Sequence, residues 1–396
     1  MTERYFPISE YERRWDLVHA EMRRRGVETA VVWGRSGGTY DRASDIYYLS
    51  NYYGNNSGQG FDNALQNCRA FSAVILRAGE KPELIIEESS PHLNLLATDR
   101  FHSTWDPVTA VAECLRARKD KGPVAFLGTD FFSMKHWREL EAATPGVTWQ
   151  FEDDIVRKVR RVKSTPELDA YREGGLIASR ACTLLIEGLL SGKSEAEAAG
   201  DAAREVVRSG GAIHMIPISH GDKIDNMCRN PLPGYSHDTP KAGDLIRGFV
   251  YGPMFQGYYL DPGRTVVAGR KPTHAQRELV ESCVEVTDAL LAALRPGLKV
   301  KELVALGDKL KAGLNVEDDE MAKKFPLYGH GLGLFFEQPI FSVAMGYGED
   351  EFVEGMVAGI EVFFARPGIG SVGFEQNAIV TSNGIELLTK TPMLWW

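Results

Sequence analysis

The chain has no excess of basic residues and no long apolar run. It carries 45 Lys and Arg against 54 Asp and Glu, a formal net charge of -9 at pH 7. A protein that follows a phosphate backbone presents a positive field, so this balance argues against nucleic acid as a ligand. No stretch approaches the roughly 18 consecutive apolar residues of a membrane span. Residues 1–26 resemble an amphipathic helix rather than a secretory leader, and no membrane association is expected.

The cysteines are few and widely separated. There are five, an odd number, and none forms a Cys-x-x-Cys pair: Cys68, Cys114, Cys182, Cys228 and Cys283. This pattern predicts reduced thiols in a cytoplasmic protein rather than a disulfide framework. The 396 residues, with 43% hydrophobic and 25% charged side chains, have an ordinary globular composition and are enough for two or three domains.

Residues 1–155 mix helical and strand patterns, which favours an α/β domain. Strands are expected at residues 28–33, 46–50, 71–76 and 84–86. The segment at residues 51–60 is rich in Gly, Asn and Tyr, and is either a floppy loop or a loop that contacts another surface. The compositional seam near residues 153–165 is the only convincing domain boundary. It contains a basic run at residues 156–163, after which Ser164 or Thr165 can cap a helix.

Residues 156–396 form the second predicted domain. Helical spacing extends from Ser164 to about Ser209, with a break at residues 191–194, and a further helix is expected at 273–293. Strands are expected at residues 213–218, 245–250, 257–265, 359–364 and 375–381.

Four polar residues of this second segment lie in strand-like or glycine-rich settings: Asp261, His330, Glu361 and Glu375. Buried unpaired charges are costly, and a divalent cation would satisfy all four side chains at once. Three carboxylates and one imidazole suit Mn, Fe, Co or Zn. Each residue also has a purely structural interpretation: a turn for Asp261, a core histidine for His330, and ion pairs with Arg264 or Arg366 for the two glutamates.

Four motifs in fixed order decide between these interpretations. They are Gly-Tyr-Tyr-x-Asp-x-x-Arg-Thr, Gly-His-Gly-x-Gly-Leu, Gly-Met-Val-x-x-x-Glu and Glu-x-x-x-x-Val-Thr-x-Asn-Gly. Together they resemble the metal-site motifs of the pita-bread family, which includes methionine aminopeptidase, aminopeptidase P, prolidase and creatinase. The resemblance implies an α/β N-terminal domain at residues 1–155 and an α+β pita-bread catalytic domain at 156–396.

The resemblance also implies a ligand set with one member missing. The family's metallopeptidases hold two metals with two Asp, one His and two Glu, and Asp261, His330, Glu361 and Glu375 match all but the first Asp. That Asp would fall at Val250, or at Phe249 if one residue is inserted. Neither side chain binds a cation, so one divalent metal ion is expected. A metal-free site like that of creatinase stays open, with His330 and the two glutamates in acid–base roles.

The residues that assist peptide hydrolysis in the family are also replaced. The peptidases carry His-Glu-x-Pro after the glycine-rich motif, where this chain keeps only Glu337, a candidate proton relay together with Glu361. Arg229 stands where the peptidases have a further His. Arg229 and Arg366 are candidate carboxylate clamps, Tyr258 is a weaker candidate for substrate contact, and His220 is a candidate acid or base.

These departures favour a hydrolase that cleaves a C–N bond (amide, ureido or amidino) of a small polar metabolite. An Xaa-Pro aminopeptidase or dipeptidase is the first alternative. A lyase acting on a small carboxylate is the second, since the Gly-x-Gly-Leu-x-x-Glu-x-Pro segment is similar to that of the family's dimethylsulfoniopropionate lyase. A non-catalytic pita-bread binding module is the third. Creatinase and prolidase relatives suggest a homodimer, with residues 51–60 reaching the neighbour's pocket.

Overall fold

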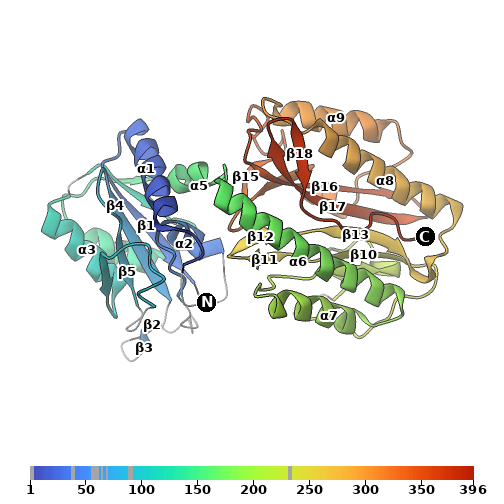
Figure 1. Cartoon of the computed structure of the whole chain (residues 1–396), viewed down its shortest axis with the longest axis horizontal. Coiled ribbons are helices and arrows are strands. Elements are labelled where there is room, and N and C mark those ends of the chain that lie inside the picture. Colours follow the sequence, from blue (N-terminus) through green and yellow to red (C-terminus); the bar gives the residue numbers. More distant parts are fainter. Residues whose placement is uncertain are drawn as a thin grey trace. The chain divides into compact units, whose positions relative to one another are not determined.

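The computed structural model describes residues 4–36, 41–54, 62–63, 66–67, 70–87, 92–120, 122–230 and 234–396. The chain divides into two compact units, Met1–Arg160 and Arg161–Trp396 (Figure 1). Of the predicted contact loop at residues 51–60, residues 55–60 lie outside the described part of the chain. Among the helices of the described ranges, none combines the length and apolar character that a membrane crossing needs.

The first unit contains a six-stranded sheet with helices packed on it. The strand order is β6-β5-β4-β1-β7-β8, with β1 antiparallel to β4 and parallel to β7. The strands are β1 (Thr29–Arg35), β4 (Phe71–Arg77), β5 (Glu83–Ile86), β6 (Phe101–Ser103), β7 (Val124–Leu127) and β8 (Trp149–Phe151), with the short pair β2 (Asp62–Asn63) and β3 (Gln66–Asn67) apart from the sheet. The helices are α1 (Ile8–Arg24), α2 (Ser44–Ser50), α3 (Pro107–Arg118), α4 (Met134–Ala143) and α5 (Asp154–Arg160). Apolar side chains of α3 and α4 join those of the sheet in one core, so this unit has the predicted α/β character.

The segment at residues 46–50 is helix, not the strand that the sequence predicts. It forms most of α2, whose last carbonyls accept hydrogen bonds from side chains of α1: Arg14 Nη1 donates to Tyr48 O over 3.0 Å, and Trp15 Nε1 donates to Leu49 O over 2.7 Å. Partners distant in sequence therefore stabilise a helix of only seven residues. A short apolar run has too few periods to separate the two structures.

The second unit contains an eight-stranded antiparallel sheet. The strand order is β15-β14-β16-β17-β13-β10-β9, and β18 also pairs with β17. The strands of the sheet are β9 (Ile218–His220), β10 (Leu245–Phe249), β13 (Gly263–Val267), β14 (Gly329–Leu332), β15 (Phe336–Ile340), β16 (Val357–Arg366), β17 (Gly370–Thr381) and β18 (Gly384–Leu387), with β11 (Gly252–Phe255) and β12 (Tyr258–Leu260) as a separate hairpin. The two longest strands, β16 and β17, lie side by side, and the shorter strands β14 and β13 flank them.

Helices pack along this sheet (Figure 1). They are α6 (Thr165–Leu190), α7 (Glu195–Arg208), α8 (His274–Ala293), α9 (Val300–Ala312) and α10 (Glu320–Lys324). The predicted cap is confirmed: Ser164 accepts from the Glu167 amide, Glu167 returns the bond, and a proline lies in the first turn of α6. A second capping box at Ser194 begins α7 after the predicted break. Apolar residues of α8, α9, β16 and β17 form the main core of the unit.

The predicted strand at residues 213–218 is mostly absent. Only Ile218 belongs to a strand, β9, and Met215 makes an isolated bridge to Tyr251. Pro217 has no amide hydrogen to continue a ladder, and its carbonyl accepts from Phe249 N over 3.0 Å. The segment therefore follows the edge of β10 as a loop with a few backbone bonds.

Candidate metal centre and cavity

Three neighbouring strands of the sheet and the end of the β11–β12 hairpin bring the four predicted ligands together. Asp261 follows β12 directly, His330 lies on β14, Glu361 on β16 and Glu375 on β17. Glu361 and Glu375 are opposite each other in the β16–β17 ladder, and His330 faces Gly359 across β14 and β16. Strand pairing therefore brings residues that are more than a hundred positions apart in the sequence together on one face of the sheet.

The imidazole of His330 lies at the centre of this group. Its Nε2 is 3.4 Å from Asp261 Oδ2, 3.6 Å from Glu361 Oε1 and 3.8 Å from Glu375 Oε1. Asp261, His330 and Glu375 each offer a ligand atom within 4.8 Å of the other two. Glu361 lies beside this tight trio, and its side chain is the most exposed of the four at 14%.

Hydrogen bonds orient two of the ligands. Asn377 Nδ2 donates to Asp261 Oδ1 over 2.7 Å, and Asp261 N donates to Asn377 Oδ1 over 3.2 Å. His330 Nδ1 lies 3.1 Å from the carbonyl oxygen of Gly331. A carbonyl only accepts, so this contact places the ring hydrogen on Nδ1 and leaves the Nε2 lone pair facing the carboxylates.

Two carboxylate oxygens of this group lack a hydrogen-bond partner. Asp261 Oδ2 and Glu375 Oε1 are buried without a hydrogen-bond donor. Burial raises the pKa of Glu375 well above its ordinary value, and the neighbouring Asp261 and Glu361 raise it further. Burial also raises the pKa of Glu361 to about 7, against the opposing effect of His330. Clustered acids with orphaned oxygens beside a free imidazole nitrogen are the donor set that a divalent cation satisfies.

A cavity of about 340 Å³ opens on these ligands. Asp261, His330, Glu361 and Glu375 form one part of its wall. The remaining described lining is apolar or aromatic: Met227, Phe249, Tyr251, Met321, Phe325, Leu327, Phe336, Ile340, Met345 and Phe363. The carboxylates thus lie at one side of an otherwise hydrophobic space.

An aromatic ring stands where the missing first Asp was sought. Phe249 pairs with Gly263 across β10 and β13, and a Cβ on Gly263 would overlap its ring. The ring also lies 5.7 Å from that of Phe363, and both line the cavity. Val250, the other candidate position, is buried and does not line the cavity. Neither position supplies a fifth acidic ligand.

A second ring takes the place of the peptidases' histidine. Phe336, immediately before Glu337, lines the cavity with its ring 4.2 Å from that of His330. Glu337 is not in the lining. Its Oε2 accepts from Lys163 Nζ over 2.8 Å, and both side chains are buried. The structure therefore places Glu337 in a buried ion pair, outside the described lining of the cavity.

The predicted substrate-binding residues lie elsewhere as well. Arg229 is held by Asp222 at 2.8 Å and Asp238 at 3.0 Å. Arg366 lies 3.3 Å from Glu278, and its Nε donates to Asn315 O over 3.0 Å. Tyr258 donates to Glu167 Oε1 over 2.7 Å beside the first turn of α6. None of these three side chains is part of the cavity lining. The structural interpretation, ion pairing and strand packing, accounts for each.

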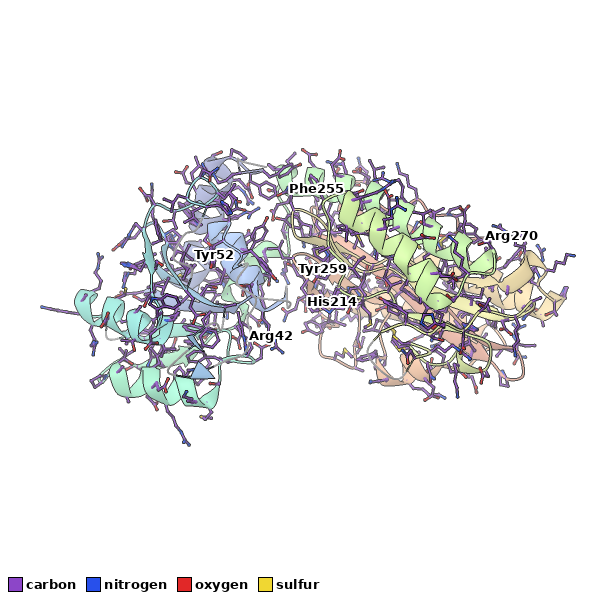
Figure 2. The ribbon with its side chains drawn as sticks, turned by 90° about the horizontal axis from the view of Figure 1, so that it is seen from below. Arg42, Tyr52, His214, Phe255, Tyr259 and Arg270 are labelled. Carbon is purple, nitrogen blue, oxygen red and sulfur yellow. The ribbon has the colours of Figure 1, made fainter. Side chains whose placement is uncertain are left out.

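His220 is also separate from the metal-ligand group. Its Nε2 is 3.3 Å from Glu195 Oε1 and its Nδ1 is 3.6 Å from Asp244 Oδ2. Burial lowers the pKa of His220 and raises that of Glu195 to about 7. His214 lies nearer the cavity, because its ring stacks 4.9 Å from that of Tyr251, which lines the cavity. The Nδ1 atom of His214 is 3.1 Å from Tyr259 Oη (Figure 2).

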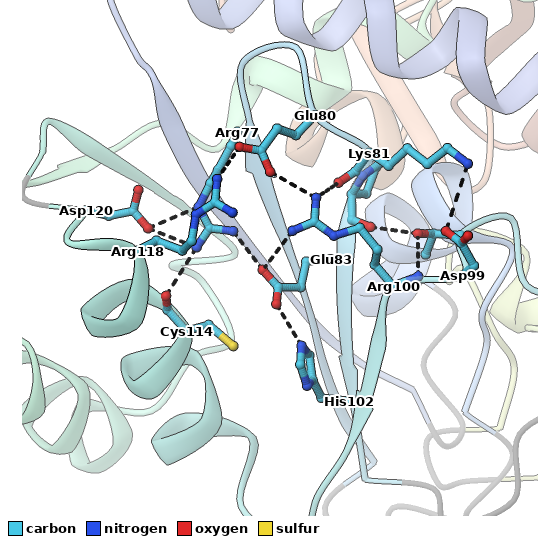
Figure 3. A network of polar contacts seen from close by, with 12 residues as sticks. Arg77, Glu80, Lys81, Glu83, Asp99, Arg100, His102, Cys114, Arg118 and Asp120 are labelled. Atoms are coloured by element: carbon cyan, nitrogen blue, oxygen red, sulfur yellow. Dashed lines mark hydrogen bonds and ion pairs between the residues drawn. The ribbon is translucent and has the colours of Figure 1, made fainter.

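A second group with metal-ligand chemistry occurs in the first unit. Glu83, His102 and Cys114 each offer one atom within 4.8 Å of the others. Arg77 already donates to Glu83 over 2.7 Å and to Asp120 over 2.9 Å, and His102 contacts Glu83 at 2.7 Å (Figure 3). Burial raises the pKa of Cys114 to about 11, so the thiol stays protonated. These contacts favour a polar network that braces β4, β5 and α3 over a metal centre.

Sequence reasoning missed the residues that surround the ligands. Asn377 lies two positions after Glu375, so both side chains point to one face of β17. This two-residue spacing is a signal from which the sequence could have identified Asn377 as a neighbour of the predicted ligands. Phe249, Tyr251 and Phe336 carried none, because aromatic residues in strands usually pack in a core.

Comparisons with known proteins agree on one family. Residues 169–382 match the model of metallopeptidase family M24. The chain is 31% identical over 245 residues to the Xaa-Pro dipeptidase of Pyrococcus furiosus, covering 60% of this chain and 66% of that protein. It is 28% identical over 338 residues to the probable dipeptidase PepE of Mycobacterium bovis, covering 81% and 84%. The alignment thus spans just under two thirds of the archaeal relative.

Solved structures show the same fold over the full length. The prolidase of Pyrococcus horikoshii OT3 matches with a TM-score of 0.73 at 21% identity, covering 96% of this chain and 99% of that one. Dipeptidase PepE of Mycobacterium ulcerans matches with a TM-score of 0.72 at 24% identity, covering 98% and 99%. The predicted fold, an N-terminal domain followed by a pita-bread domain, is confirmed.

Proposed function

Because the chain belongs to metallopeptidase family M24, we propose that it hydrolyses a C–N amide bond of a small substrate with one divalent metal ion. Asp261, His330 and Glu375 would hold this ion, with Glu361 beside them. The observation that carries the proposal is the pair of buried, unpartnered carboxylate oxygens facing His330 Nε2. The ion, when bound, supplies Lewis acidity that polarises an amide carbonyl and lowers the pKa of water.

The chain's own residues have separable tasks in this reaction. Glu361 is the least enclosed acid of the group and lines the cavity, so it is placed to accept a proton from water and return it to the leaving nitrogen. Asn377 fixes the carboxylate of Asp261, and the Gly331 carbonyl fixes the His330 ring. The apolar walls limit water around the scissile bond, which strengthens the electrostatic interactions there.

The aromatic replacement favours one ion over two. The Phe249 ring packs over Gly263 and lines the cavity beside Asp261. A second ion would need a carboxylate where this ring lies. With one ion, the three carboxylates and a neutral imidazole retain a net negative charge.

The relatives' names favour an amide substrate over the ureido or amidino bond of a polar metabolite. Both curated relatives described above are called dipeptidases, one of them specifically an Xaa-Pro dipeptidase. Xaa-Pro compounds are therefore the first substrates to test. This alternative replaces the creatinase-like metabolite as the preferred class, and the apolar cavity supports the change.

The test combines loading and turnover. Purified protein loaded with Mn, Fe, Co or Zn in turn is assayed on Xaa-Pro dipeptides and their amides, with Asp261→Ala as control. Release of proline or prolinamide by the loaded wild type alone supports the proposal. Loaded wild type that cleaves none of these amide bonds would contradict it.

A homodimer and a cytoplasmic location complete the proposal. The homodimer rests on the resemblance to creatinase and prolidase, and the cytoplasmic location rests on the scattered cysteines. Light scattering and cell fractionation test them, and a monomer or an exported protein would contradict them.

A further inference from the structure

We propose that the cavity accepts an apolar amide that carries no carboxylate beside the scissile bond, so that prolinamide-type compounds are preferred over free Xaa-Pro acids. The inference rests on the proposed amide hydrolysis and names its substrate class. It goes beyond the relatives' names, because a free dipeptide ends in a carboxylate. The cavity wall and the fate of the nearby cations carry the argument.

The wall offers an apolar substrate close packing. Phe249, Phe336 and Phe363 line the space next to the ligands, with Phe336 4.2 Å from His330 and Phe249 5.7 Å from Phe363 between ring centroids. Met227, Met321 and Met345 extend the lining with flexible apolar side chains. Burying apolar area of a substrate against such a surface is favourable. The same surface offers a charged group few hydrogen-bond donors.

The cations that might receive a carboxylate are committed to other anions. Arg229 is paired with Asp222 and Asp238, and Arg366 with Glu278. Two buried cations of the same unit are paired as well, Lys163 with Glu337 and Arg247 with Asp319, each at 2.8 Å. Among the residues that the structure describes, the cavity lining includes no Lys or Arg.

The acids of the site add a repulsive contribution. Asp261, Glu361 and Glu375 all line the cavity, and their formal charge exceeds that of one divalent ion. A substrate carboxylate would be desolvated among apolar groups next to this negative centre, which is strongly unfavourable without a paired cation. A protonated amino group is instead attracted to the same negative centre. The site therefore distinguishes amide from acid substrates at the end of the substrate that carries the carboxylate.

One cation at the cavity rim needs its own control. Lys324 lies outside the lining, with its ammonium 5.2 Å from the centre of the Phe325 ring. Phe325 does line the cavity and is 42% exposed. Lys324→Gln is expected to leave the preference between acid and amide unchanged. A loss of Leu-Pro binding in this variant would show that the rim supplies a carboxylate site and would overturn the inference.

The first experiment compares Leu-Pro with Leu-prolinamide on the metal-loaded wild type. The two share the apolar residue and the scissile bond and differ only in the terminal group. We expect kcat/KM for the amide to exceed that for the acid by on the order of 100-fold, the cost of an unpaired buried charge. Equal rates, or faster cleavage of Leu-Pro, would overturn the inference and leave the proposed hydrolysis intact.

Binding to the metal-free protein gives a readout independent of turnover. Calorimetric titration is expected to show at least about 10-fold weaker binding of Leu-Pro than of Leu-prolinamide. Equal affinities would overturn the inference even if neither compound were cleaved, whereas a clear preference without cleavage would retain it and contradict only the hydrolysis. Phe325→Arg, at an exposed position of the lining, should reduce the preference for Leu-prolinamide over Leu-Pro. Met134→Arg, on the exposed surface of the first unit, should leave this preference unchanged.

Discussion

Asn377 holds Asp261 through two hydrogen bonds, one to the Asp261 carboxylate and one from its backbone amide. The bonds leave Asp261 Oδ2 as the unpartnered oxygen that faces His330. Partners of this kind set the orientation of a metal ligand and are typically worth 10–100-fold in metal affinity.

Asn377→Ala should therefore weaken Mn binding by about 10–100-fold without unfolding the protein. Calorimetric titration measures the change, and circular dichroism checks the fold. Asn315→Ala, at an exposed position, is the matched control. Unchanged affinity in Asn377→Ala would show that Asp261 needs no support.

Phe249→Asp tests why the site takes one ion. The new carboxylate would lie beside Asp261, where the ring now fills the space over Gly263. We expect the variant to bind a second equivalent of Mn at millimolar metal, measured by elemental analysis after gel filtration. Two equivalents in the wild type would contradict the assignment of Phe249.

The Lys163–Glu337 pair separates a structural from a catalytic role for Glu337. Both side chains are buried at 2–3% exposure, 2.8 Å apart. Lys163→Met removes one partner of this buried ion pair and should lower the free energy of unfolding by about 3–5 kcal/mol, measured by urea denaturation. Lys163→Met combined with Glu337→Met should recover much of this loss. If Lys163→Met were instead as stable as the wild type but catalytically inactive, the result would indicate a catalytic role for Glu337.

Glu195 should make stability depend on pH. Its folded pKa is about 7 because the side chain is buried, whereas an unfolded Glu titrates near its ordinary value of about 4.3. The folded state keeps this proton longer, so its contribution to stability is full below about pH 4 and is lost as the pH rises to 7. The free energy of unfolding should fall by on the order of 3 kcal/mol more in wild type than in Glu195→Gln between pH 4.5 and 8. Parallel pH profiles for the two proteins would contradict this.

The resemblance predicted the fold and the grouping of Asp261, His330, Glu361 and Glu375 better than the surroundings of that group. The role of these four residues as metal ligands stays a prediction. The four residues lie in motifs whose order resembles that of the family, and strand register brings His330, Glu361 and Glu375 together. The same resemblance identified the pita-bread fold, which the solved relatives confirm.

The surroundings depend on contacts that a linear pattern does not reveal. Nothing in the sequence around Arg229 shows that Asp222 and Asp238 bind it. Likewise, Lys163 lies 174 positions from Glu337. The helix α2 depends on side chains of α1 in the same way. The role of a charged residue near a site can be assigned only when its ion-pair partners are known.

Metal content of the purified protein tests the central claim most directly. Elemental analysis of wild type, Asp261→Ala and Cys114→Ser after incubation with Mn and gel filtration distinguishes the two ligand groups. We predict about one equivalent in wild type, loss of that equivalent in Asp261→Ala, and retention in Cys114→Ser. Wild type without metal, or Asp261→Ala that still holds a full equivalent, would contradict the account.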